Sequence, residues 1–308
     1  MNDATEIAAA RARLGAIGLF DAKAVEAARL TRLGGLTNRN WAVEIGGDRL
    51  VLRIPGEGTS AYIDRKAEKH NAEVAARAGV NAPVLHFDSA DGVMLCRYVD
   101  GATMDGARFR DLGAVARAAR AFRRMHDWPE AFQARFDLFE KMDEYLALLR
   151  KLDAPVPEGY EAAQREAEAV RAALARKPAP LAPCHCDPLA ENFLDTGTRM
   201  VIVDWEYSGM NDPMWDLGDL SVEAGFGRVQ DAALLEAYFE GPAPAEAAGR
   251  MVLYKAMCDL LWTLWGAIQH ANKNPVDDFW AYAVNRFERC RRLMADAEFR
   301  EALKAVAA

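Results

Sequence analysis

The 308-residue sequence has only five cysteines, and their odd number and scattered positions exclude a disulfide framework. No secretory signal precedes the first predicted helix, because the opening residues up to Arg13 are polar, alanine-rich and amphipathic. No run of about 18 apolar residues is free of charge, which argues against a membrane-spanning helix. These absences predict a protein of the reducing cytoplasm that has no membrane partner.

Positive charge is also in short supply, with 38 Lys and Arg residues against 46 Asp and Glu and a net charge of −8. A surface of this sign repels phosphate backbones, so we do not expect a nucleic-acid partner, whereas a small cation would be attracted. The 51% hydrophobic and 27% charged residues are typical of a globular protein. The length suggests about two domains, and nothing indicates the oligomeric state.

The first hundred residues are predicted to form a small antiparallel sheet with helices. Apolar or alternating segments between Gly- and Asp-rich turns indicate five strands, at 30–33, 41–45, 50–54, 84–87 and 94–99. Residues 61–78 contain no Gly or Pro and are followed by Gly79, which indicates a helix after the third strand. The amphipathic opening segment is expected to form an N-terminal helix.

Beyond Gly101 the pattern changes to long helices. Helical periodicity predicts helices at 109–127, 137–152 and 160–177, a β-like segment at 192–204, and helices again from 231 to the end. We therefore expect an α+β, bilobal fold. Residues 1–100 would form the N-terminal lobe with a hinge near 96–100, and residues 101–308 the larger helical lobe. Ligands usually bind in clefts between such lobes.

The most informative segment runs from His185 to Asp204 and has the pattern His-x-Asp-x-x-x-x-Asn followed by two apolar pieces that a tight turn separates. The two pieces should pair as an antiparallel hairpin. Because Asn192 and Asp204 lie at nearly equal distances from the turn, pairing brings their side chains to its open end. An amide oxygen beside a carboxylate suits Mg²⁺, and Asp187 lies near enough to act as a base.

A carboxylate base beside an Asn/Asp metal clamp is what phosphoryl transfer from MgATP requires. The metal neutralises the phosphate oxygens while the base orients an attacking hydroxyl. A chance hairpin with acidic ends is the alternative interpretation. The sequence contains no G-x-x-x-x-G-K-[ST] motif, which excludes a Walker-type site.

The N-terminal lobe contains residues that could contact the nucleotide. The turn at 34–38 joins two strands, and its backbone amides could cover phosphates, although most such turns are only turns. The candidates in this turn are Gly35, Thr37 and Asn38. Arg53, at the end of the third strand, could pair with Glu68 on the following helix and reach a phosphate. Glu73 is the competing partner, and a solvated surface pair is the alternative.

With these motifs the chain resembles the choline/ethanolamine kinases of the aminoglycoside phosphotransferase superfamily, which have the bilobal protein-kinase-like fold. The resemblance covers about residues 30–287 and is strongest at 34–64, 185–223 and 261–287. It implies ATP and Mg²⁺ as cofactors. The roles that it implies are a catalytic base at Asp187, metal ligands at Asn192 and Asp204, a phosphate-positioning pair of Arg53 and Glu68, and adenine contacts at Arg97, Tyr98 and Val99. Arg53 stands where protein kinases carry Lys, as is usual in choline kinases.

Aromatic residues in the C-terminal third are expected to hold the acceptor. Trp262 and Trp265 lie three apart on a predicted helix and share a face, and their segment is similar to the one that supplies cage aromatics in choline kinases. The other expected substrate-binding residues are Tyr207, Asp219, Glu223, Phe279 and Tyr282. A quaternary ammonium has no N–H to donate, so ring faces at about 0.5–2 kcal/mol each, and carboxylates, must bind it. A helix-bundle core is the alternative interpretation of these aromatics.

The sequence thus predicts an ATP-dependent kinase that phosphorylates the hydroxyl of choline. Ethanolamine, whose primary ammonium would use carboxylates more than rings, thiamine, a methylthiopentose and an aminoglycoside are alternative acceptors. A pseudokinase that binds without chemistry is a further alternative. His185 is expected to brace the catalytic loop, while Asp216 is either structural or catalytic. A metal site at residues 184–186 is not expected, because zinc-knuckle spacing is absent.

Overall fold

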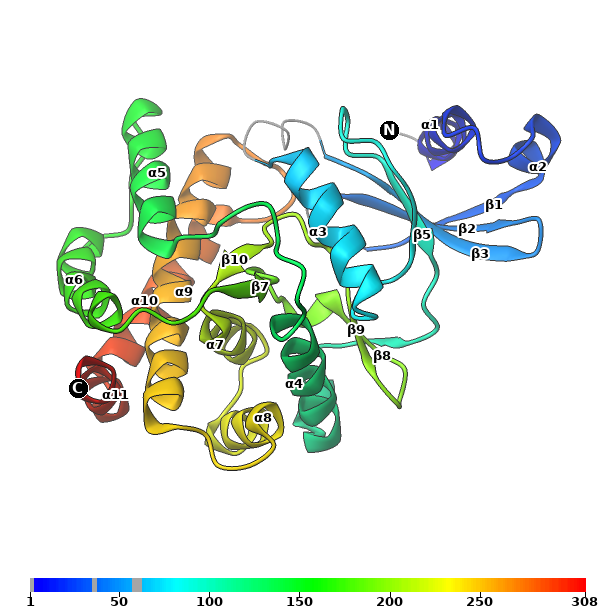
Figure 1. Cartoon of the computed structure of the whole chain (residues 1–308). Coiled ribbons are helices and arrows are strands. Elements are labelled where there is room, and N and C mark those ends of the chain that lie inside the picture. The colour runs from blue at the N-terminus through cyan, green and yellow to red at the C-terminus, as the bar shows by residue number, and fades with distance from the viewer. Residues whose placement is uncertain (1–2, 35–37, 57–62) are drawn as a thin grey trace.

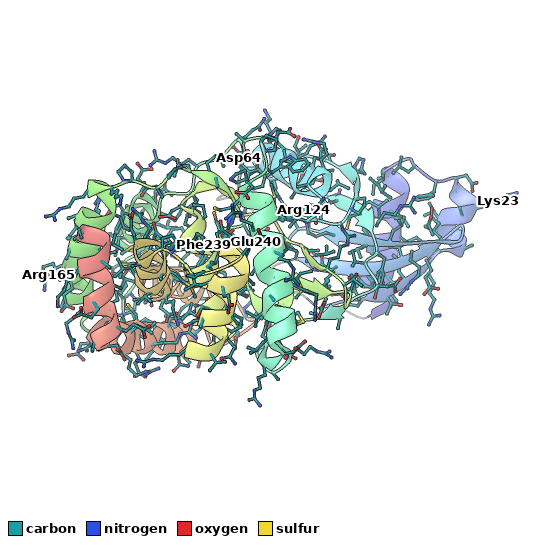
Figure 2. The ribbon with its side chains drawn as sticks, turned by 60° about the horizontal axis from the view of Figure 1, so that its bottom comes forward. Lys23, Asp64, Arg124, Arg165, Phe239 and Glu240 are labelled. Atoms are coloured by element: carbon teal, nitrogen blue, oxygen red, sulfur yellow. The ribbon has the colours of Figure 1, made fainter. Side chains whose placement is uncertain are left out.

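The computed structural model describes residues 3–34, 38–56 and 63–308, and it places a small β-rich part beside a larger helical part (Figure 1). In Figure 2, Lys23 and Arg165 lie at opposite ends of the molecule, with Asp64 and Arg124 between them. The β-rich part contains a five-stranded antiparallel sheet of order β1-β2-β3-β5-β4. Its strands are β1 (Arg29–Arg32), β2 (Arg39–Ile45), β3 (Asp48–Ile54), β4 (Val84–Phe87) and β5 (Met94–Arg97). The five predicted strands are confirmed.

The β2–β3 hairpin follows from its sequence. Its two-residue turn is Gly46-Gly47, and both glycines have positive φ, 58° and 89°, as a type I′ turn requires. In the resulting register Trp41 lies opposite Leu52. One face of the sheet, which includes both side chains, packs against helices α1 (Asp3–Ala16) and α2 (Ala22–Ala27). The neighbouring residue Arg53 therefore projects from the other face.

Helix α3 (Arg65–Arg77) lies between β3 and β4 in the chain and contacts β4. It begins at Arg65, later than predicted, because the Asp64 side chain accepts hydrogen bonds from the backbone N–H groups of residues 66 and 67 and caps the helix. The predicted residues 61–62 lie outside the described residues. Gly79, with φ of +72°, follows the helix end as expected.

The helical part contains eight α-helices among the described residues. They are α4 (Leu112–His126), α5 (Leu138–Lys151), α6 (Tyr160–Arg176), α7 (Pro213–Glu223), α8 (Arg228–Phe239), α9 (Ala245–Ala271), α10 (Phe279–Ala295) and α11 (Ala297–Ala307). The prediction that helices resume at residue 231 was wrong, since α7 begins at Pro213. Asp212 caps α7 and Pro213 occupies its first turn, but residues 214–222 are all buried, so the helix shows no amphipathic period.

Short strands complete the helical part and were mostly missed by the sequence pattern. They are β6 (Ala102–Thr103), β7 (Ala182–Cys184), β8 (Phe193–Asp195), β9 (Met200–Ile202) and β10 (Gly209–Asn211). β8 and β9 are the predicted hairpin, β6 pairs with β8, and β10 pairs with β7. The lobe boundary at residue 100 stays a prediction. Such a boundary would assign β6, which begins at Ala102, to the helical part, where its partner β8 lies.

Helix α9 is the central helix of the helical part and packs against α5, α7, α10 and α11. Among the described residues it is the one helix that is long and apolar enough to cross a membrane, which the search for uncharged runs did not find. Of its most apolar window, 89% is buried inside the structure. Its composition is thus that of a helix surrounded by other helices.

Candidate active site

The β8–β9 hairpin brings the two predicted metal ligands to the same end. Phe193 pairs with Ile202, and the N–H of Val203 donates to the carbonyl of Asn192 at 2.9 Å, which extends the ladder by one pair. Asn192 therefore lies opposite Val203 and next to Asp204 in register. Asp204 has a positive φ of 68°, so the backbone turns away from the strand at this residue.

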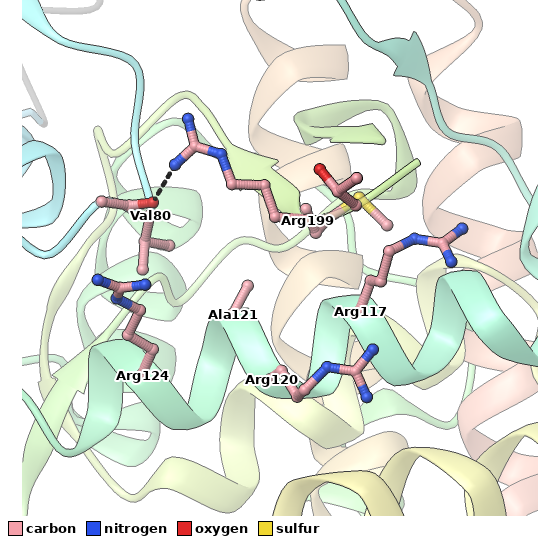
Figure 3. A pocket seen from close by; sticks show the side chains of 9 residues that line it. Val80, Arg117, Arg120, Ala121, Arg124 and Arg199 are labelled. Carbon is pink, nitrogen blue, oxygen red and sulfur yellow. Dashed lines mark hydrogen bonds between the residues drawn. The ribbon is translucent and has the colours of Figure 1, made fainter. Parts of the chain in front are cut away.

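The opposite end of the hairpin, its turn, is held by arginines. A cavity of about 100 Å³ lies between α4 and this turn, and Arg117, Arg124 and Arg199 are among the residues that line it (Figure 3). Arg117 binds both carboxylate oxygens of Asp195 on β8, at 2.8 and 2.5 Å. Arg199 donates to the carbonyl of Gly79 at 2.9 Å. The turn is thereby anchored to α4 and to the end of α3, which fixes the hairpin that carries Asn192 and Asp204.

The loop before the hairpin is braced by a buried carboxylate. Asp216 on α7 accepts the backbone N–H groups of His185 and Cys186, at 2.7 and 2.8 Å, and lies 3.0 Å from Nε2 of His126. The His185 ring donates from Nε2 to the carbonyl of Val203 at 2.9 Å, and burial lowers the pKa of this histidine. His185 thus contacts backbone as expected, and Asp216 takes the structural role. His126 of α4 is also part of this brace.

Asp187, the predicted base, follows this braced loop and is half-buried. Burial raises the pKa of Asp187 well above its usual value, and the negative charges of Glu223, Asp204 and Glu206 raise it further. The Nδ2 group of Asn192 donates to the backbone carbonyl of Asp187 at 3.1 Å. Since its nitrogen holds the loop, the amide oxygen of Asn192 is the atom that this side chain can offer to a metal.

Arg53 and Glu68 form the predicted ion pair, and both side chains are buried, so neither Glu73 nor a solvated surface pair is what the structure contains. Arg53 also lies 3.3 Å from Asp204 in the helical part. Burial alone would lower the pKa of Arg53, but Glu68, Asp204 and Glu206 together raise it above its ordinary value. Arg53 therefore remains charged and joins the β-rich part to the hairpin.

Arg65 and Glu206, which the sequence analysis did not single out, complete this group together with the predicted Asn38. Arg65, the first residue of α3, binds Glu68 at 2.6 Å and Glu206 at 3.3 Å. Asn38 donates to Glu206 at 3.2 Å. We call the whole group the charged junction, and its members are Asn38, Arg53, Arg65, Glu68, Asp204 and Glu206. In the sequence, the position of Glu206 two residues after the predicted metal ligand Asp204 was the signal that could have identified Glu206 as part of this group.

The charged junction has the chemistry of a site for a hard cation. Carboxylate oxygens of Glu68, Asp204 and Glu206 all lie within 4.8 Å of one another. Burial, followed by the charges of Asp204 and Glu68, raises the pKa of Glu206 to about 7, although Arg53 and Arg65 oppose this. Convergent oxygen ligands are what Mg²⁺ prefers, and its charge would relieve the repulsion between these carboxylates. The residues present thus fit a divalent ion.

The other predicted nucleotide-binding residues are placed as follows. Gly35 and Thr37 lie outside the described residues. Arg97 is exposed and pairs with Asp48, so its side chain is engaged on the surface. Tyr98 and Val99 are half-buried, and the N–H of Tyr98 donates to the carbonyl of Arg49 at 3.0 Å. The proposed adenine contacts of these three residues stay predictions.

The five predicted aromatic residues gather into one cluster. The centroids of the Tyr207 and Trp262 rings are 5.4 Å apart, and those of Trp262 and Trp265 are 6.4 Å apart. The Trp265 ring centroid lies 5.5 Å from that of Phe279 and 5.7 Å from that of Tyr282. All four of these ring contacts are edge-to-face. We call this group the aromatic cluster. It joins helices α9 and α10 to the loop after β9.

The two predicted carboxylates, Asp219 and Glu223, lie one turn apart on α7. The thiol of Cys258 on α9 donates to Asp219 at 2.8 Å, and Arg286 on α10 forms an ion pair with Glu223. Burial raises the pKa of Asp219 well above its usual value, and the nearby charges of Glu223 and Asp187 raise it further. Both carboxylates also lie within electrostatic reach of the predicted base, Asp187.

Some buried polar atoms of this region have no hydrogen-bond partner within the described part of the chain. They include Oδ2 of Asp219, the indole N–H groups of Trp262 and Trp265 in the aromatic cluster, and Oδ1 of Asn38 in the charged junction. Each such atom costs roughly 1–3 kcal/mol when it is left unsatisfied. A polar ligand or ordered water at these positions would offset that cost.

Comparison with known proteins agrees with this geometry. A model of the phosphotransferase enzyme family matches residues 29–254. A solved choline/ethanolamine kinase family protein from Mesorhizobium loti is 54% identical, covers 97% of this chain and 98% of its own, and has a TM-score of 0.87. The fold and site thus define a phosphotransferase of bilobal, protein-kinase-like architecture, as predicted. More narrowly, the chain belongs to the choline/ethanolamine kinase family.

Two more distant relatives indicate the range of acceptors. The choline kinase LicA from Streptococcus pneumoniae is 28% identical, covers 87% of this chain and 93% of its own, and has a TM-score of 0.75. LicA has also been solved in complex with AMP. Ethanolamine kinase 2 of Mus musculus is 27% identical over 83% of this chain and 73% of its own length. The chain is therefore a nucleotide-dependent kinase whose acceptor is a small-molecule alcohol.

Proposed function

We propose that this chain is an ATP-dependent choline kinase that produces phosphocholine and ADP. The observation that carries the proposal is the aromatic cluster, whose rings contact one another edge to face and whose Tyr282 lies within electrostatic reach of Asp187. A permanently methylated ammonium offers no N–H, so ring faces are the groups that bind it best. The partner is a small molecule, and the location is the cytoplasm.

In this proposal Asp187 accepts the proton of the choline hydroxyl as the oxygen attacks the γ-phosphorus. A raised pKa suits that role, because a base works best when its pKa approaches the ambient pH. Asn192 and Asp204 would hold Mg²⁺, with Glu68 and Glu206 close by, and the ion would neutralise phosphate oxygens. Arg53, fixed by Glu68, would orient a phosphate with its planar guanidinium.

The state of the carboxylates favours choline over ethanolamine. Glu223 is already paired with Arg286, and Asp219 accepts the thiol of Cys258. Little carboxylate charge is then left for a primary ammonium, which needs acceptors for its N–H groups. One observation favours ethanolamine as the second candidate, since Oδ2 of Asp219 is buried without a partner in the described residues.

The test is an ADP-release assay of the purified protein with choline, ethanolamine, thiamine and kanamycin as acceptors. We expect kcat/KM for choline to exceed that for each other acceptor by about tenfold or more. Preference for another acceptor would overturn the choline assignment. Absence of ADP release above background with every acceptor would instead indicate a binding protein without turnover.

A further inference from the structure

Arg286 on α10 occupies a position that the proposed chemistry does not yet use. Only 6% of its surface is exposed, and its guanidinium contacts three other side chains. Nη2 donates to the hydroxyl of Tyr282 at 2.7 Å, while Nη1 pairs with Glu223 and lies 3.0 Å from Asp259. The guanidinium carbon also lies over the Tyr282 ring, 4.9 Å from its centroid. One rigid group thus connects a ring of the aromatic cluster to a carboxylate of α7.

The orientation of Arg286 is fixed from behind by Asp259 of α9. Asp259 is fully buried and receives a second, bidentate arginine, Arg289, at 2.6 and 2.7 Å. With Asp259 on one side, Nη1 of Arg286 reaches Glu223 and Nη2 reaches the hydroxyl of Tyr282. A lysine could not reproduce this, since its ammonium is a point charge without a planar fork.

We propose that Arg286 is a positioning and specificity-determining residue of the acceptor pocket, an inference that rests on the proposed choline kinase function. It holds the Tyr282 ring in place against Trp265. It also neutralises Glu223, so that the acceptor's ammonium is recognised by ring faces rather than by a free carboxylate. Arg286 therefore sets the preference for a quaternary over a primary ammonium without contacting the reacting atoms.

The test separates these two actions with Arg286→Lys, Tyr282→Phe and Arg286→Met. For each variant, kcat and KM are measured with choline, ethanolamine and ATP. Tyr282→Phe removes the hydroxyl contact without changing any charge, so it should raise KM for choline about three- to tenfold and leave KM for ATP unchanged. Arg286→Met also frees Glu223, so the choline-to-ethanolamine ratio of kcat/KM should fall about tenfold or more. Arg286→Lys should give an intermediate ratio.

The double variant Arg286→Met/Glu223→Gln and the control Arg289→Lys complete the test. If Arg286 acts by neutralising Glu223, removal of that charge should reverse most of the gain for ethanolamine. Arg289 contacts the same Asp259 but neither Glu223 nor Tyr282 in the described hydrogen bonds, so Arg289→Lys should lower Tm and leave the acceptor ratio unchanged.

The proposal fails if the acceptor ratio of the Arg286 variants stays within about twofold of the parent, or if KM for ATP changes as much as KM for choline. Tyr282→Phe and Arg286→Lys keep the proposal testable should Arg286→Met not fold, because both retain the buried charge balance. A parent enzyme that prefers an acceptor other than choline would contradict the proposed function itself. A parent that prefers choline, with unchanged ratios in the variants, would contradict only the role of Arg286.

Discussion

In the proposed function the charged junction and the aromatic cluster bind opposite kinds of ligand, and the structure builds them in opposite ways. The junction combines donors from the β-rich part with carboxylates of the hairpin region, and its buried charges are paired. The cluster uses two helices and one loop and consists of rings that touch edge to face. Removing one charge from the junction leaves its buried partner uncompensated. Removing one ring from the cluster takes away one cation–π contact with the bound ligand. Damage should therefore be larger in the junction, and it should affect a different kinetic constant.

The largest effect is expected for Asp187→Asn. In the proposed reaction Asp187 accepts the proton of the acceptor hydroxyl as this oxygen attacks the phosphate, so the substitution concerns the ligands of both the charged junction and the aromatic cluster. Loss of the proton acceptor should lower kcat by about 10²–10⁴-fold, with KM for ATP and choline little changed. Steady-state kinetics measure kcat and both KM values. The control is Asp143→Asn, at an exposed aspartate on α5. A kcat within a few-fold of the parent would show that Asp187 is not the base.

Glu68→Gln comes next and tests the junction alone. Arg53 would lose its closest carboxylate while it stays buried, which should lower the free energy of unfolding by about 3 kcal/mol. KM for ATP should rise and kcat fall, together by about 10- to 100-fold in kcat/KM, and KM for choline should be unaffected. Glu73→Gln, on the same helix but outside the pair, is the control. Equal effects of the two substitutions would refute a role specific to Glu68.

The pH dependence of kcat sharpens the assignment of the base. Asp187 must be ionised to accept a proton, and its pKa is raised by burial and by neighbouring carboxylates. Activity should therefore be complete above this raised pKa and fall by about tenfold per pH unit below it, so the acid limb lies above the value for an ordinary aspartate. A profile that stays flat down to about pH 4 would contradict the raised pKa.

Local patterns predicted the hairpin and the Arg53–Glu68 pair, because strand alternation and one intervening helix determine both. Arg65 and Glu206 were missed, since the contact between them joins residues 141 positions apart. The brace on the catalytic loop has the same origin, with His126 and Asp216 meeting only after α4 packs near α7. Long-range pairing of this kind leaves no periodic signal in the sequence.

Two elements illustrate the same limit at the level of the fold. β7 and β10 have three residues each, and their pairing is fixed by the surrounding helices rather than by a turn. α7 is buried on every side from Met214 to Val222, so hydrophobic periodicity could not reveal it. The two ring pairs of the aromatic cluster, by contrast, were predictable, because spacings of three on α9 and α10 place each pair on one helix face. That the two pairs serve one site was implied by the resemblance to choline kinases.

In the aromatic cluster, Trp265→Leu should have the greatest effect, because Trp265 contacts Trp262, Phe279 and Tyr282. KM for choline should rise about tenfold, and KM for ATP should not change. The matched control is Trp280→Leu on α10, whose ring contacts His270 outside the cluster. If KM for ethanolamine rises as much as KM for choline, the rings do not select the quaternary ammonium.

The smallest effect is expected for Gly266→Ala, which shifts one ring without removing it. A Cβ at Gly266 would lie 2.6 Å from Cδ1 of Tyr282, so the ring must move away from α9. We expect KM for choline to rise about two- to fivefold, with a Tm loss typical of overpacking. Gly249→Ala on the same helix would contact Val306 at 3.1 Å, far from the cluster, and should lower Tm while leaving KM for choline unchanged. If both variants gave the same KM, the position of Tyr282 would not govern acceptor binding, and the contrast between ring contacts and paired charges would lose its basis.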